Sequence, residues 1–149
     1  MQAALFVLGT SHPIQCGTDG VGPTTVSAFE GELRRVCEEL GIRRIAEEMN
    51  QLGLKRHGVT HTVGQRIAED NGAEHHYIDL GPQDRVMLSL DDGVMLGIAM
   101  GQYGVDAGRF RDAFSVLWSD VRERAWIGRL LASNQWPVLF ICGSNFHES

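Results

Sequence analysis

The sequence predicts a single α/β domain, built as a three-layer sandwich around a mainly parallel sheet of roughly four strands. The length of 149 residues is that of one domain with one hydrophobic core. Apolar residues make up 43% of the chain and charged residues 21%, a balance that is typical of globular proteins and excludes a disordered chain. Short apolar runs alternate with helical patterns, an order typical of a parallel sheet with helices on both faces.

Four short runs predict the strands. They cover residues 3–8, 42–46, 76–80 and 137–142. The first and the last are continuously apolar, as expected of strands that are buried on both faces of a parallel sheet. The middle two are more polar, so we expect them nearer a sheet edge. Right-handed crossover connections favour the Rossmann-like spatial order 3-2-1-4 for these strands.

Helical patterns occupy the intervals between the strands. They cover residues 24–40, 62–71 and 109–133. The first two each end at a glycine, the residue that most often terminates a helix in the left-handed conformation. The third is the longest amphipathic pattern and runs either without interruption or with a break near Trp126. The segment 84–101 is ambiguous, because a turn signal at 91–93 precedes an apolar helical pattern over 94–100.

The chain is acidic, with 13 basic and 19 acidic residues and a formal net charge of -6. This charge argues against nucleic acid as the main partner, because phosphate binding relies on clustered basic side chains. No stretch approaches the roughly 20 apolar residues that span a bilayer, and the first apolar run has no basic leader, so we expect neither a membrane span nor a signal peptide. The three cysteines show no CxxC spacing, which is typical of reduced thiols in a cytoplasmic protein.

Each predicted strand delivers ionisable or hydrogen-bonding groups, the backbone N–H of a glycine included, at its carboxyl end. They are Thr10, His12 and Gln15 after the first strand, Glu48 after the second, Asp79 and Arg85 around the end of the third, and Gly143 and His147 after the fourth. Since ligands of parallel α/β sheets bind at the carboxyl ends of the strands, we expect these residues to share one crevice. A histidine, a carboxylate and a second histidine suit water activation, because an imidazole accepts a proton and a carboxylate orients it or binds a divalent metal.

Other residues have simpler interpretations. Taken alone, Glu47 and Glu48 are typical of solvated carboxylates at the start of a helix. The remaining histidines are His57, His61, His75 and His76. We interpret these four as surface residues, because no apolar helix face accompanies them as it does in a helical zinc pair. The sequence has no GxGxxG, P-loop lysine, HExxH or GxSxG motif, which argues against dinucleotide, P-loop, zincin and α/β-hydrolase chemistry.

Four short motifs occur in order along the chain. They are Gly9 and His12 in a G-x-x-H after the first strand, Glu48 after the second, Glu123 and Arg124 with Trp126 in the C-terminal helical pattern, and a last strand ending at Gly143. Together they resemble the superfamily that groups TraB-like proteins, Tiki proteases, ChaN-like proteins and erythromycin esterases. His147 departs from this pattern, since it follows Gly143 by four residues instead of three. Either a bulge brings His147 to the site, or the second histidine is absent.

The resemblance implies a hydrolase-like protein of the esterase or metal-dependent peptidase type. It implies a divalent metal (Mn, Co or Zn) held by His12, Glu48 and His147. Without His147, His12 would act independently of metal. Because members of this superfamily differ in chemistry, the shared architecture leaves the reaction open.

The leading hypothesis is a small hydrolase in which His12 is the general base or a metal ligand and Glu48 is its carboxylate partner. The residues expected to bind substrate are Thr10, Gln15, Asp79, Arg85, Arg124 and Gly143. Arg85 or Arg124 would hold an anionic or carbonyl group of a small-molecule or peptide substrate. One alternative is a non-catalytic module that binds a small ligand or a protein in the same crevice. Another is a structural polar network in a chain that forms homo-oligomers through apolar helix surface.

Overall fold

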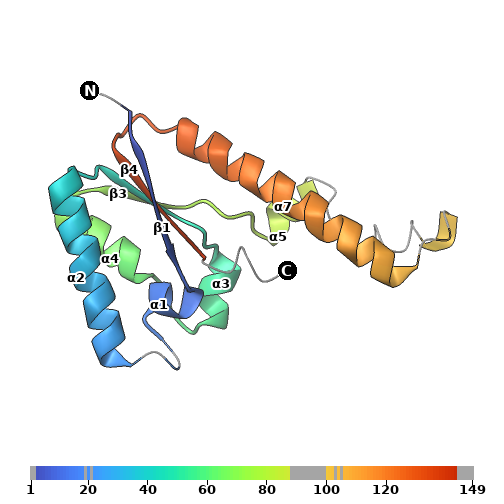
Figure 1. Ribbon diagram of the computed structural model, residues 1–149, viewed down its shortest axis with the longest axis horizontal. Helices are drawn as coiled ribbons and strands as arrows, with labels where there is room; N and C mark the ends of the chain where they lie inside the picture. Colours follow the sequence, from blue (N-terminus) through green and yellow to red (C-terminus); the bar gives the residue numbers. More distant parts are fainter. Residues whose placement is uncertain are drawn as a thin grey trace.

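The computed structural model describes residues 3–18, 20, 22–87, 100–102, 104 and 106–143. In this part of the chain, four parallel strands form one sheet in the spatial order β1-β4-β2-β3 (Figure 1). The strands are β1 (Leu5–Thr10), β2 (Arg44–Glu47), β3 (Glu74–Tyr77) and β4 (Val138–Gly143). The predicted α/β class with a parallel sheet is therefore confirmed.

The strand order differs from the predicted 3-2-1-4, because β4 lies between β2 and β1 instead of outside β1. Leu139 of β4 is in register with Phe6 of β1 and with Ile45 of β2. The residues of β4 are buried nearly throughout, whereas β1 leaves Leu5 46% and Val7 63% exposed. Both strands are apolar runs in the sequence, so their composition could not tell an interior strand from an edge strand.

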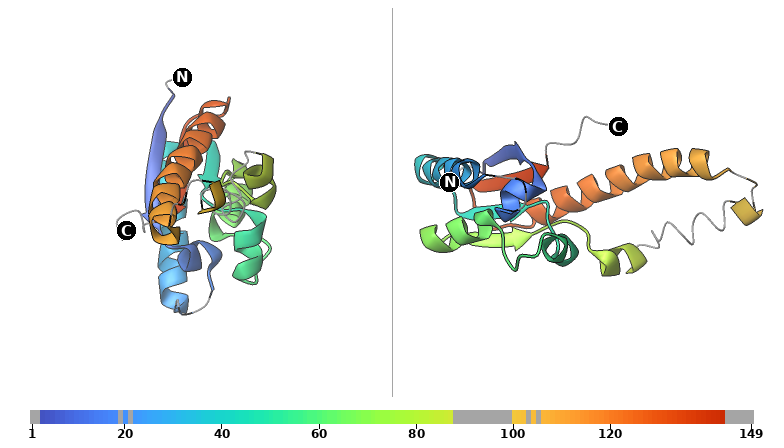
Figure 2. Two further views of the ribbon diagram at one scale, coloured as in Figure 1. Left: turned by 90° about the vertical axis from the view of Figure 1, so that its right-hand side faces the viewer. Right: turned by 90° about the horizontal axis from the view of Figure 1, so that it is seen from below.

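Helices cover the two faces of the sheet and complete the three layers (Figure 1). On one face lie α2 (Pro23–Leu40) and α4 (Val63–Asn71), whose apolar stripes pack on the sheet. On the other face lies α7 (Ala107–Leu131), where Trp126 packs against Phe140 of β4 with 5.7 Å between ring centroids. The N-terminal half of α7 extends beyond the sheet, as the right-hand view in Figure 2 shows.

The ends of the predicted helices follow local sequence signals. Gly41 and Gly72 end α2 and α4 with φ of 60° and 65°, the left-handed conformation that favours glycine. The Thr62 side chain caps α4 by accepting a hydrogen bond from the Gln65 N–H. Helix α7 runs without the break considered near Trp126. These boundaries agree closely with the sequence patterns, because caps and stop signals act within one turn.

Three further short helices lie in the described part of the chain, besides the helical residues 100–102. They are α1 (His12–Cys16), α3 (Gln51–Arg56) and α5 (Pro82–Met87). The first two were not predicted, since each is too short for an apolar period to emerge, and the third overlaps the start of the segment 84–101, which the sequence left ambiguous. The apolar helix expected over 94–100 lies outside the described residues, apart from Met100. Among the described helices, none combines the length and apolar character needed to cross a bilayer.

Candidate functional site

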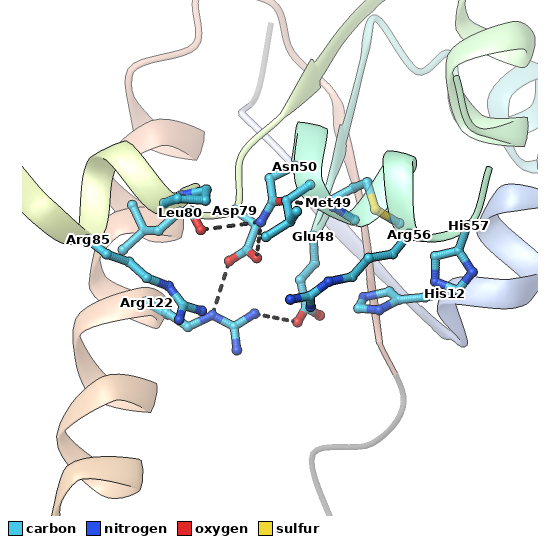
Figure 3. A pocket seen from close by; sticks show the side chains of 13 residues that line it. His12, Glu48, Met49, Asn50, Arg56, His57, Asp79, Leu80, Arg85 and Arg122 are labelled. Atoms are coloured by element: carbon cyan, nitrogen blue, oxygen red, sulfur yellow. Dashed lines mark hydrogen bonds and ion pairs between the residues drawn. The ribbon is translucent and has the colours of Figure 1, made fainter. Parts of the chain in front are cut away.

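A pocket of about 320 Å³ lies at the carboxyl edge of the sheet (Figure 3). Its lining includes His12, Glu48, Asn50, Arg56, His57, Asp79, Arg85 and Arg122. These side chains come from the first turn of α1, from the segments after β2 and β3, and from α3, α5 and α7. The structure thus brings together the strand-end residues His12, Glu48, Asp79 and Arg85, as the topology of a parallel sheet requires.

Glu48 is held rigidly between two elements. Its carboxylate oxygen Oε2 accepts a hydrogen bond from the Gly143 N–H at 2.7 Å, at the end of β4. The other oxygen, Oε1, pairs with Arg122 Nη2 of α7 at 2.8 Å. The side chain is 7% exposed, so both contacts act with little competition from water.

His12 faces the same point as Glu48. A Cβ on Gly143 would stand 3.3 Å from Glu48 Oε2, a tight contact, and 3.8 Å from His12 Nε2, so both polar atoms lie beside the Gly143 backbone. The buried His12 Nε2 has no hydrogen-bond partner among the described residues. Its ring also makes an edge-to-face contact with His57, with 6.3 Å between centroids. A buried ring nitrogen without a partner requires an explanation, and in a polar pocket a water or ligand atom supplies one.

Arg122 connects the two carboxylates of the pocket. Besides Glu48, its Nε donates to Asp79 Oδ1 at 3.0 Å. Asp79 also accepts from Trp126 Nε1 at 3.1 Å and from Asn50 Nδ2 at 3.1 Å. Two carboxylates therefore share one guanidinium, and each is fixed by further donors. This network gives the wall of the pocket a defined shape.

The sequence pattern points to Arg124 as the arginine of α7 in the crevice, but Arg122 is the one that lines the pocket. Arg124 instead pairs with Asp120, its side chain is 78% exposed, and it does not line the pocket. Residues two apart on an α-helix differ by about 200° in direction, so they cannot face the same side. Arg122 shares the sheet-facing side of α7 with Trp126, four residues later, and this spacing was the signal that could have identified it.

Gln15 also departs from its predicted place. It is completely buried and donates to Glu47 Oε2 at 3.3 Å, away from the pocket. Glu47, expected in solvent, is 0% exposed and is further bound by the Thr62 hydroxyl and by His75 Nε2, the latter at 2.8 Å. Tyr77 lies beside this cluster and accepts a hydrogen bond from the Thr62 N–H at 3.1 Å. The buried cluster around Glu47 is thus a second polar network, separate from the pocket.

Two of the four histidines assigned to the surface lie elsewhere. His75 is almost buried against Glu47, and His57 lines the pocket at the end of α3. His61 and His76 are exposed, as predicted. The position of His57 depends on the short helix α3, which the sequence did not predict. The Asn50 side chain caps the start of α3 by accepting a hydrogen bond from the Gly53 N–H, and the C-terminal end of α3 directs His57 towards His12.

The remaining predicted residues occupy varied positions. Thr10 ends β1 opposite Gly143 in the register and does not line the pocket. Arg85 lines the pocket, with its guanidinium 4.3 Å from the centroid of the Trp118 ring. His147 lies outside the described residues.

The described residues around His12 and Glu48 do not suit a divalent metal. Nowhere in the described ranges do three His, Cys, Asp or Glu side chains gather as a metal-binding group. Glu48 already accepts from Gly143 and pairs with Arg122, whose positive charge would repel a cation at the same oxygens.

Comparisons of the chain with protein-family models, with curated proteins and with solved structures find no match. Function is therefore inferred from the geometry of the pocket.

The three cysteines are free and buried, and we expect them to be unreactive in the folded protein. Burial, helped by the charge of Glu47, raises the pKa of the Cys16 thiol to about 11. Burial likewise raises the pKa of Cys37 to about 11 and the pKa of Cys142. Since the thiolate is the nucleophile, iodoacetamide near pH 8 should label the native protein slowly and the unfolded chain at all three positions, as counted by mass spectrometry. Rapid labelling of the native protein would contradict this expectation.

Proposed function

We propose that this protein is a small hydrolase in which His12 and Glu48 activate a water molecule. One observation carries the proposal: the unpartnered His12 Nε2 and the Glu48 carboxylate face one point beside Gly143 in a polar pocket. An imidazole ionises near neutral pH, so it can take up and return a proton within one turnover. The resemblance to the erythromycin esterase and Tiki superfamily is compatible with this chemistry, since that superfamily includes a water-activating esterase and metal-dependent peptidases.

For a carboxylic ester, the reaction would proceed in two proton transfers. As the water oxygen attacks the carbonyl carbon, His12 Nε2 takes one proton from the water. The imidazolium then returns this proton to the departing alcohol oxygen as the ester C–O bond breaks, which leaves an acid and an alcohol. In this mechanism Glu48 would stabilise the imidazolium through its negative charge, and the N–H groups of Arg122 that Glu48 and Asp79 leave unused would stabilise the oxyanion that develops on the carbonyl.

A binding module without catalysis is the second candidate. It is favoured by the fact that both oxygens of Glu48 are already engaged, by Gly143 and Arg122. In that case the carboxylate shapes the pocket and does not take part in chemistry. Binding of a ligand without turnover would support this candidate.

The test is turnover of p-nitrophenyl acetate, p-nitrophenyl butyrate and a dipeptide p-nitroanilide. We expect His12→Ala to lower kcat/KM by about 100- to 10,000-fold, the range of general-base catalysis. Glu48→Gln keeps an acceptor for the Gly143 N–H but removes the charge, and we expect a loss of about ten-fold or more. His61→Ala serves as the matched control, because His61 is exposed and outside the pocket. Turnover that is unchanged in both pocket variants, with unchanged melting temperatures, would remove the proposal.

A further inference from the structure

Three guanidinium groups line the pocket, and only one of them forms ion pairs with carboxylates of the described residues. Arg122 pairs with both Glu48 and Asp79 (Figure 3). Neither Arg56 nor Arg85 forms an ion pair with any carboxylate of the described residues, although both line the pocket. The lining therefore holds more positive than negative charge even with neutral histidines, in a protein whose net charge is negative.

Arg85 is oriented by an aromatic ring. Its guanidinium lies 4.3 Å from the centroid of Trp118, and the guanidinium of Arg122 lies 5.8 Å from the same centroid. Stacking on an indole holds a guanidinium in place without using its N–H donors, so those of Arg85 stay available to a ligand. The guanidiniums of Arg85 and Arg122 repel each other beside this ring, and an anion bound by Arg85 would offset this repulsion.

We propose that the substrate of this site carries a phosphate group, bound by Arg85 and Arg56. The inference rests on the proposed function, and it names the substrate class of the same pocket. A phosphate monoester carries close to two negative charges near pH 7 and has three acceptor oxygens. It can therefore accept hydrogen bonds from the guanidinium groups of two arginines at the same time. A carboxylate has one charge and two oxygens, which a single arginine already satisfies. The phosphate is the group by which the substrate is held, and the bond that the activated water attacks lies elsewhere in the same molecule.

The size of the pocket agrees with this class. A volume of about 320 Å³ is at the small end for ligand pockets, so it suits a phosphorylated small molecule. His57 and His12 line the same wall and add hydrogen-bond donors or acceptors for the rest of the ligand. The acidic net charge of the protein makes a long polyanion an unsuitable ligand.

Binding of inorganic phosphate and of acetate, measured by calorimetry and by thermal shift at constant ionic strength, tests the proposal. We expect phosphate to bind and acetate to bind far more weakly. Arg85→Ala and Arg56→Ala should each weaken phosphate binding about ten-fold or more, since each removes charged hydrogen bonds. Arg124→Ala is the matched control, because Arg124 is an exposed arginine of α7 that pairs with Asp120. Equal binding of both anions, or phosphate binding unchanged in the Arg85→Ala/Arg56→Ala double variant, would overturn the phosphate site.

The two proposals fail in different ways. His12→Ala should still bind phosphate, because the phosphate is held by the arginines. Phosphate binding that depends on Arg85 and Arg56, in a protein without ester turnover, would overturn the hydrolase and support the phosphate site. Conversely, turnover of p-nitrophenyl acetate that depends on His12, in a protein whose phosphate binding is unchanged in the Arg85→Ala/Arg56→Ala double variant, would overturn only the phosphate site.

Discussion

Replacing Glu47 by alanine is expected to lower the free energy of unfolding by about 3–5 kcal/mol, because the change removes the centre of a buried polar network. The Glu47 carboxylate is 0% exposed and is bound by Gln15, Thr62 and His75. All three partners would lose an acceptor in a place that water cannot easily reach, and each unsatisfied group costs about 1–3 kcal/mol. Urea unfolding followed by circular dichroism measures the effect.

The neighbouring strand offers a matched control for Glu47. Glu74 of β3 pairs with His76 at 3.7 Å, but its side chain is 48% exposed. Exposed ion pairs contribute about 0–1 kcal/mol, so Glu74→Ala should leave the unfolding midpoint almost unchanged. A Glu47→Ala protein as stable as Glu74→Ala would show that the network around Glu47 adds nothing to the fold.

Replacing Gly64 by alanine should destabilise the protein by about 1–3 kcal/mol, although alanine is the better helix former. Gly64 lies in the first turn of α4, and a Cβ there would stand 2.5 Å from Glu47 Oε1 and 3.2 Å from Ile141 Cδ1. Glu47 cannot move aside, because its hydrogen bonds to Thr62 and His75 hold it. The clash therefore opposes the gain in helix propensity and exceeds it. The change in the free energy of unfolding, measured by urea denaturation, shows whether the substitution destabilises or stabilises the protein.

Two comparisons separate the clash from other effects of the substitution. Gly31 of α2 is exposed, and a Cβ added there would meet no atom within 4 Å, so Gly31→Ala should stabilise the protein by about 0.5–1 kcal/mol. In a Glu47→Ala background the clash with the carboxylate disappears, so Gly64→Ala should cost much less there than in the native protein. If Gly64→Ala were as stabilising as Gly31→Ala, the close packing of α4 on β2 would be refuted.

The first of these effects concerns Glu47, which the sequence assigned to the solvent. Glu47 and Glu48 are adjacent acidic residues, and nothing local distinguishes them from a solvated pair. Their burial depends on α1, α4 and α7, whose contacting residues come from distant parts of the chain: Gln15, Thr62 and Arg122. A buried carboxylate needs such partners, and a sequence pattern does not show which residues will supply them.

The candidate pocket was predictable only in part. His12, Glu48, Asp79 and Arg85 line it because parallel strands end at one edge, a rule that needs only the order of strands and helices. The sequence did not identify Arg122 or His57 as lining residues. Whether Arg122 faces the pocket depends on the rotation of α7 about its own axis, and the position of His57 depends on the short helix α3. Short helices and helix phase are set by packing, so single-sequence patterns predict them poorly.

Local sequence was sufficient for the alternation of strands and helices, for the parallel α/β class and for the helix ends at Gly41 and Gly72. These features follow from apolar periodicity and from the conformational freedom of glycine, both of which act over a few residues. The position of β4 between β1 and β2, the burial of Glu47 and the choice of Arg122 over Arg124 were decided by the folded chain. Each of these depends on free energy gained between segments far apart in the sequence, which becomes available only when the segments meet.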